Sequence, residues 1–276
     1  MAFKRKEITI NGKRDCYWEK NPLEKEVIVL LHGFPGNHLG ILDVAKKLDG
    51  YRLIVPDLPS CGQSEPIDGH YSLETYSEWL GEFLNSLSIN NAIFIGHSFG
   101  SRISLVFASK NPNKVKLLVL MTPVVKVEGL IARFVLLENK IAEILPESLK
   151  GVWLSSKLYR TIAHIILFKS SGPKRRKVLI DRDTKELKHL HPHVNIELFL
   201  DEFYKDSLAP IGKKIKTKSL IIAGDDDEIA PLDLIKELAG QLTDVKFIIM
   251  KNSGHALPME RPSATAKIIQ NWIGEA

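Results

Sequence analysis

Short, largely apolar runs recur along the chain, and stretches in which apolar residues have helical spacing separate them. Runs of this kind predict strands that are covered on both faces of a sheet. They are Val27–Leu31, Tyr51–Val55, Ala92–Ile95, Val115–Met121, Ser219–Ala223 and Val245–Met250. Strands that alternate with helices predict an α/β fold, in which helices cover both faces of a mostly parallel twisted sheet.

The amino-terminal segment Glu7–Trp18 holds two strand-like pieces on either side of Asn11-Gly12. This dipeptide favours a tight hairpin turn, so we expect an antiparallel pair of strands at one edge of the sheet. Helical spacing predicts helices at Leu42–Leu48, at Tyr71–Leu87 with Ser72 as N-cap, from Ser101 onward, and at Ala264–Ile273.

The alternation stops after Val124, and helical patterns follow one another until about Ser207. Residues 124–207 are therefore predicted to form a helical cap inserted into a core of residues 1–123 and 208–276. Its apolar positions are a stripe of Leu130, Phe134, Leu137, Ile141 and Ile144, and a second segment, Tyr159–Phe168, that contains His164.

Composition places the chain among ordinary globular proteins, because 44% of its 276 residues are hydrophobic and 26% are charged. Two cysteines, Cys16 and Cys61, are too few for a disulfide scaffold. The amino terminus lacks the apolar core of a signal peptide, and no stretch is long and apolar enough to span a membrane. We therefore expect a cytoplasmic protein.

The predicted cap carries most of the net charge of +5, since it holds 15 lysines and arginines against 11 aspartates and glutamates. Its basic run, Lys174, Arg175, Arg176 and Lys177, is expected to be a solvated loop, with contact to an anionic partner or membrane surface as the alternative. Nothing resembles a recognition helix or an aromatic and basic surface, so no nucleic-acid partner is expected.

Three alternating histidines in the cap, His189, His191 and His193, could face one way as metal ligands. No cysteine or paired carboxylate accompanies them at ligand spacing. We therefore predict no metal site from this pattern.

The sequence Gly96-His97-Ser98-Phe99-Gly100 joins a predicted strand to a predicted helix. GxSxG in this context indicates a nucleophile elbow, in which two glycines permit a strained turn that exposes the serine. The amino end of the helix then points at the serine, and the Phe99 N–H could stabilise an anion forming on a substrate. The His32-Gly33-Phe34-Pro35-Gly36 loop ends another strand at the same edge of the sheet, where the Phe34 N–H could supply a second donor.

Two later strand ends deliver an acid and a histidine, in Gly224–Pro231 and in Asn252-Ser253-Gly254-His255. A histidine can take the proton of a serine hydroxyl, and a carboxylate can hold the histidine in the required tautomer. Ser98 and His255 are thus candidate nucleophile and base. His97 is interpreted as a packing residue of the elbow whose side chain points away.

Five separated motifs make nearly all of the chain outside the cap resemble the α/β-hydrolase superfamily, in the branch with an inserted cap. They are HGFPG, the segment Asp57–Ser64, GHSFG, Gly224–Pro231, and Gly254-His255 ahead of Glu260-Arg261-Pro262. The order serine, acid, histidine is that of this fold. The family's spacing selects Asp227 as the acid, with Asp225 and Asp226 as fallbacks. Cys61 and Ser101 occupy positions where relatives often carry glycine.

The resemblance implies a serine hydrolase that needs no cofactor and cleaves carboxylic esters through an acyl-enzyme on Ser98. The apolar residues of the cap, including Phe134, Trp153 and Phe168, suggest a small apolar ester as substrate. The same triad also serves carbon–carbon bond hydrolases, thioesterases, amidases and perhydrolysis, and a slow-turnover ligand receptor is a further alternative. The sequence does not determine the oligomeric state.

Overall fold

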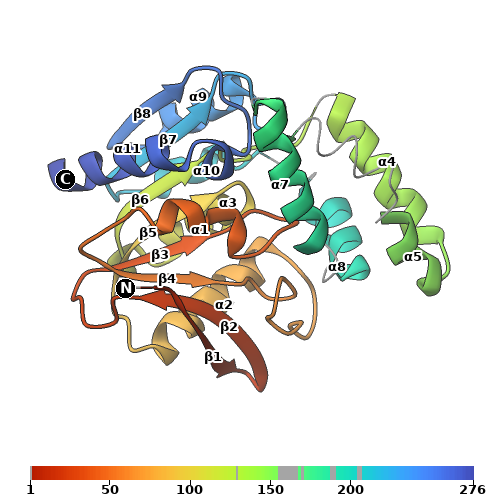
Figure 1. Ribbon diagram of the computed structural model, residues 1–276, viewed down its shortest axis with the longest axis horizontal. Helices are drawn as coiled ribbons and strands as arrows, with labels where there is room; N and C mark the ends of the chain where they lie inside the picture. The colour runs from red at the N-terminus through yellow and green to blue at the C-terminus, as the bar shows by residue number, and fades with distance from the viewer. Residues whose placement is uncertain (1, 129, 155–166, 169–170, 187–190, 204–206) are drawn as a thin grey trace.

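A single sheet organises the chain in the computed structural model, which describes residues 2–128, 130–154, 167–168, 171–186, 191–203 and 207–276 (Figure 1). In this described part the sheet has eight strands in the order β1-β2-β4-β3-β5-β6-β7-β8. Their bounds are β1 Lys4–Ile10, β2 Lys13–Lys20, β3 Val27–Leu31, β4 Arg52–Pro56, β5 Ala92–His97, β6 Val115–Met121, β7 Ser219–Gly224 and β8 Val245–Met250.

The first two strands form the predicted hairpin at one edge of the sheet. β1 pairs antiparallel with β2, and Ile10 lies opposite Lys13 across the turn. Both turn residues have positive φ, 50° at Asn11 and 78° at Gly12, as a tight hairpin turn requires. β2 pairs antiparallel with β4, and all later pairs are parallel. The prediction of a mostly parallel sheet is thus confirmed.

Helices cover both faces of the sheet because alternate side chains of its central strands point to opposite sides. Ile28 and Leu30 pack with α1 and α11, whereas Val29 and Leu31 pack with the group that contains α2, α3 and α9. These helices and the short segments of the core are α1 Leu39–Ala45, α2 Leu73–Ser86, α3 Phe99–Lys110, η1 Pro112–Lys114, η4 Ala209–Lys214, α9 Leu232–Gln241, α10 Leu257–Glu260 and α11 Pro262–Glu275.

Helix boundaries depart from the sequence prediction where tertiary contacts fix a helix end. α1 begins at Leu39 rather than Leu42, because the Asn37 carboxamide accepts the Leu39 N–H and the Asp57 carboxylate accepts the His38 N–H. By contrast, Ser72 is the N-cap of α2 as predicted, and its hydroxyl oxygen accepts the Thr75 N–H at 3.2 Å.

The described part of the segment between β6 and β7 is mainly helical, and its helices gather at one end of the sheet (Figure 1). Its two ends lie close together, because the Leu208 N–H donates to the Val125 carbonyl oxygen at 3.0 Å and β6 pairs directly with β7. We call residues 124–207 the helical insertion; these bounds remain the sequence prediction. Its described elements are α4 Leu130–Ile144, α5 Glu147–Leu154, α7 Pro173–Glu186, α8 Pro192–Glu197 and the π-helical turn η3 Leu198–Glu202.

The predicted apolar stripe of the insertion is only partly covered. Leu137 is 56% exposed and Ile144 is 82% exposed, so the stripe does not pack as one continuous face. Of the second predicted apolar segment, only Leu167 and Phe168 lie within the described residues, and His164 lies outside them. No helix among the described residues is both long enough and apolar enough to cross a membrane.

Candidate active site

Ser98 lies at a sharp turn between β5 and α3, near the centre of the sheet. Its backbone has φ 53° and ψ −115°, a conformation that costs free energy for a residue with a Cβ. A Cβ at Gly96 would lie 2.5 Å from the carbonyl oxygen of Gly100, and one at Gly100 would lie 2.3 Å from that of Leu31. Only glycine fits at either position. The GxSxG sequence therefore forms the sharp turn that it predicts.

The side chains of Ser98, His255 and Asp227 form a continuous hydrogen-bonded chain. Ser98 Oγ lies 2.8 Å from His255 Nε2, and His255 Nδ1 lies 2.9 Å from Asp227 Oδ2. A carboxylate only accepts, so Nδ1 carries the proton and Nε2 is left to accept the serine hydroxyl. The other carboxylate oxygen, Asp227 Oδ1, accepts the N–H groups of Ile229 and Ala230, both at 2.9 Å.

This chain draws its residues from three strand ends. Ser98 follows β5, Asp227 follows β7 and His255 follows β8, and all three residues are buried. One sequence fallback, Asp225, does not take the same place: it lies near Lys251 and accepts the Ser253 N–H at 3.3 Å. Asp227 is therefore the acid that the fold brings to His255.

His97 does more than fill space behind the elbow. Its Nε2 lies 2.9 Å from the carbonyl oxygen of His255 and must donate to it, and the Thr122 hydroxyl donates to the same oxygen at 3.1 Å. Burial and the nearby His255 lower the pKa of His97 to about 3, so the ring stays neutral. His97 and Thr122 therefore fix the backbone that carries the candidate base.

The loop after β3 lies directly against the elbow. A Cβ at Gly33 would lie 3.1 Å from the Cβ of Ser98. His32, which is fully buried, accepts the Leu58 N–H at Nε2 and places Nδ1 2.8 Å from the Gly33 carbonyl oxygen, so Nδ1 is protonated. Burial lowers the pKa of His32 to about 4, which keeps this bracing residue neutral.

The two predicted anion donors are the backbone N–H groups of Phe34 and Phe99. Phe99 is the first residue of α3, where N–H groups have no partner within the helix. In the described part of the chain, neither amide donates to a backbone acceptor of a turn or loop. Their role as donors to a substrate oxygen remains a prediction from the sequence.

Aromatic rings gather beside these two residues. Phe34 and Phe99 lie 5.9 Å apart, and Phe203 of the insertion lies 5.3 Å from Phe99. Phe199, one helical turn before Phe203, stacks on it at 4.9 Å and lies 6.1 Å from Phe34. The insertion therefore contributes apolar rings next to the serine.

Two of the aromatic residues that the sequence suggested for a substrate pocket, Trp153 and Phe168, pack against other parts of the fold. Trp153 packs within the insertion, where its indole N–H donates to the Glu138 carbonyl oxygen at 3.2 Å. Phe168 is buried against Ala256, next to the candidate base. Phe199 and Phe203 could not be singled out from the sequence, because only the folded insertion brings them to the loop after β3.

Arg102 connects α3 to both ends of the insertion. It lies one turn after Ser98, is only 2% exposed, and donates to the carbonyl oxygens of Val124 at 3.1 Å and Glu202 at 3.2 Å. Burial lowers the pKa of Arg102 to about 10, so its guanidinium remains charged at neutral pH. The sequence gives no signal for this role.

The basic run is not a loop, and the sequence expectation is wrong in that respect. Lys174 to Lys177 form the first turn of α7, which begins at Pro173. Arg175 donates to the carbonyl oxygen of Met259 and Arg176 donates to that of Phe168. Arg175 and Arg176 therefore connect α7 to the backbone at Met259 and at Phe168. Contact of the run with an anionic surface remains a prediction.

Two of the three alternating histidines fall in described residues. His191 precedes α8 and His193 lies within it, with their ring centres 5.9 Å apart. His189 lies outside the described residues. Both cysteines are buried free thiols, and burial raises the pKa of each.

Comparison with known proteins agrees with this fold. Residues 26–262 match the family described as alpha/beta hydrolase fold, so the chain belongs to the alpha/beta hydrolase family. The expectation drawn from the five motifs is confirmed at this level.

Individual known proteins resemble the chain over nearly its whole length. The chain is 26% identical to Lipase 1 of Psychrobacter immobilis over 95% of its own length and 81% of the lipase. It is 27% identical to Lipase 3 of Moraxella sp. (strain TA144), over 95% and 82% of the two chains. The structure of a thermophilic esterase from Thermogutta terrifontis superposes with a TM-score of 0.80 at 20% identity, and the match covers 99% of this chain and 98% of the esterase. The protein is a hydrolase-fold enzyme that resembles lipases and carboxylesterases.

Proposed function

We propose that the protein hydrolyses carboxylic esters through an acyl-enzyme on Ser98. The observation that carries the proposal is the hydrogen-bonded chain from Ser98 through His255 to Asp227, on an elbow that only glycines permit. A serine hydroxyl becomes nucleophilic when a base within hydrogen-bond reach accepts its proton. The similarity to lipases and an esterase supports an ester as the bond that is cleaved.

The proposed reaction has two halves. In the first, Ser98 Oγ attacks the ester carbonyl carbon while its proton passes to His255 Nε2, and the N–H groups of Phe34 and Phe99 stabilise the oxyanion. The imidazolium, held by Asp227, then protonates the departing alcohol. In the second half, His255 takes a proton from water, which attacks the acyl carbon and releases the acid.

The aromatic rings beside the serine favour an apolar acyl or alcohol group. Phe199 and Phe203 come from the insertion, and Phe34 and Phe99 come from the core. Each buried CH₂ contributes about 0.8 kcal/mol, which corresponds to roughly fourfold in kcat/KM. We expect kcat/KM to rise with chain length until the apolar site is filled.

The test is hydrolysis of p-nitrophenyl esters from acetate to palmitate by the wild type and by Ser98→Ala. We expect release of p-nitrophenol that falls by at least about 10³-fold in Ser98→Ala. Ser109→Ala is the matched control, since Ser109 lies on the same helix and donates only to the Val106 carbonyl oxygen. Its activity should equal that of the wild type.

No release from any ester by the folded wild type would overturn the proposal. The assays would then turn to carbon–carbon, thioester and amide substrates, and to ligand-induced melting shifts for a receptor. The cytoplasmic location expected from the sequence is part of the same proposal.

A further inference from the structure

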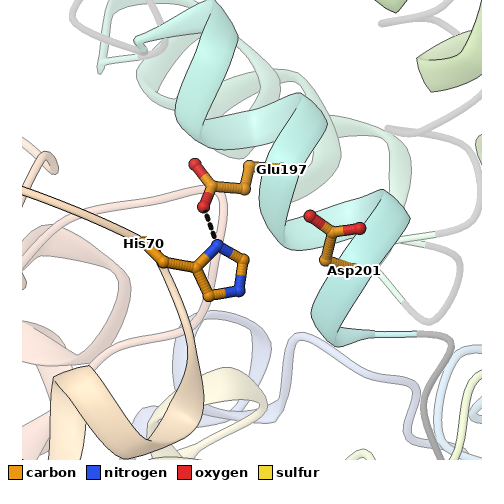
Figure 2. A group of neighbouring side chains, drawn as sticks. All are labelled: His70, Glu197 and Asp201. Carbon is orange, nitrogen blue, oxygen red and sulfur yellow. Dashed lines mark ion pairs between the residues drawn. The ribbon is translucent and has the colours of Figure 1, made fainter.

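His70, Glu197 and Asp201, none of which belongs to the candidate triad, come together in the fold (Figure 2). His70 lies between β4 and α2, whereas Glu197 ends α8 and Asp201 lies in η3. One ligand atom from each residue lies within 4.8 Å of the other two. The group thus joins the core to the helical insertion across a long separation in the sequence.

Two contacts from the core hold the Glu197 carboxylate in place. His70 Nδ1 forms an ion pair with Glu197 Oε1, and the Tyr71 N–H donates to the same oxygen at 2.9 Å. Asp201 completes the group, and among the described residues its carboxylate has no hydrogen-bond or ion-pair partner. His70 and Asp201 are exposed and Glu197 is half-buried, so the carboxylate of Asp201 is accessible to an ion from solvent.

We propose that His70, Glu197 and Asp201 bind a divalent transition-metal ion, with zinc as the ion that fits best. An imidazole nitrogen with two carboxylate oxygens is a ligand set that zinc accepts, at distances of about 2.0–2.2 Å. Magnesium and calcium prefer oxygen ligands alone, so the imidazole argues against them. A divalent ion would also balance the two carboxylates.

Bound zinc would hold the insertion against the core, because its ligands come from both. A ligand that binds only the docked arrangement stabilises that arrangement in proportion to its occupancy. This inference goes beyond the proposed function and does not depend on ester hydrolysis.

The test uses the full chain after treatment with a chelator and dialysis. Titration with zinc chloride by calorimetry should give one binding event, and zinc should raise the melting temperature. Asp201→Asn is the decisive variant, because it keeps the ion pair of His70 and Glu197 while weakening a ligand. We expect it to lower the affinity at least tenfold and abolish the melting shift, as should His70→Ala.

His193→Ala and Asp233→Asn are the matched controls. His193 lies near the group without belonging to it, and Asp233 is an exposed acid of α9. Both should bind zinc as the wild type does. Absence of zinc binding by the wild type would overturn the proposal, and so would binding that survives in Asp201→Asn and His70→Ala but is lost in His193→Ala.

Discussion

The guanidinium carbon of Arg102 lies 5.3 Å from the ring centre of Phe203, although Arg102 lies one turn after the candidate nucleophile and Phe203 lies near the end of the helical insertion. The same guanidinium binds the carbonyl oxygens of Val124 and Glu202. A charge buried in this way is stable only because these contacts replace water. Arg102 therefore links the position of the apolar rings to the helix that carries the serine.

Replacing Arg102 by methionine should destabilise the fold by about 2–4 kcal/mol, because two buried carbonyl groups lose a charged donor. Arg102→Lys should recover part of this, since lysine keeps the charge but lacks the planar fork. Urea unfolding measures both variants. Arg133→Met, an exposed arginine of α4, is the control and should change stability little. Equal stability of Arg102→Met and Arg133→Met would contradict the assigned role.

Asp227→Asn should lower kcat about 10³- to 10⁴-fold, because an amide cannot hold His255 in the tautomer that accepts the serine proton. The fold should survive, since the amide oxygen can still accept the N–H groups of Ile229 and Ala230. Steady-state ester hydrolysis measures the effect. Asp225→Asn is the matched control. A comparable loss of kcat in Asp225→Asn would contradict the assignment of Asp227 as the acid.

His97→Phe and Thr122→Val each remove one of two donors to the His255 carbonyl oxygen. Each single variant should lose about 1 kcal/mol of transition-state stabilisation, roughly five- to tenfold in kcat, with little change in KM. The double variant leaves the carbonyl without either donor and should lose more than the sum of the two. Strict additivity in kcat would show that the two residues do not act on one group.

Asp15 should make the protein less stable as the pH rises from about 4 to 7. It is 2% exposed, and burial raises the pKa of its carboxyl to about 7. The unfolded chain, with a pKa near 3.9, therefore binds fewer protons than the folded protein in that window. Stability contributed by the protonated form is complete below pH 4 and is lost as the pH rises through 7.

Asp15→Asn should remove this dependence and exceed the wild type in stability at pH 8, by on the order of 2–4 kcal/mol. Urea unfolding at pH 4, 6 and 8 measures the free energy of unfolding of the two proteins. Asp244→Asn, at an exposed position, should follow the wild type at each pH. A wild type and Asp15→Asn with parallel pH profiles would contradict the assignment.

Local sequence signals predicted the sheet and the strand ends well. The hairpin at Asn11-Gly12, the buried parallel strands and the glycine-bounded turn at Ser98 each follow from backbone geometry or burial of neighbouring residues. The acid and the histidine were found because each follows a strand at a family motif. Their approach to Ser98 then follows from the order of the strands.

Contacts made across the fold left no such signal. In the sequence, Arg102 has the pattern of an ordinary polar residue on a helix, so its contact with Glu202 is not indicated. The contact between His70 and Glu197 is not indicated either, because the two residues are far apart in the sequence. The charge of the basic run predicts a solvated loop, whereas the run lies in α7, which begins at Pro173. Side chains that act through tertiary contacts are identified only when the chain is folded.

The closeness of the two ends of the insertion, at Val125 and Leu208, bears on how this protein could diversify. A segment that leaves and re-enters at neighbouring strands can change length at little cost, about 0.6 kcal/mol of chain entropy for each doubling. The whole helical insertion could therefore be replaced by another segment while Ser98, His255 and Asp227 stay in place. The strand ends that hold Ser98, His255 and Asp227 and the segment that supplies Phe199 and Phe203 are thus separate stretches of the chain.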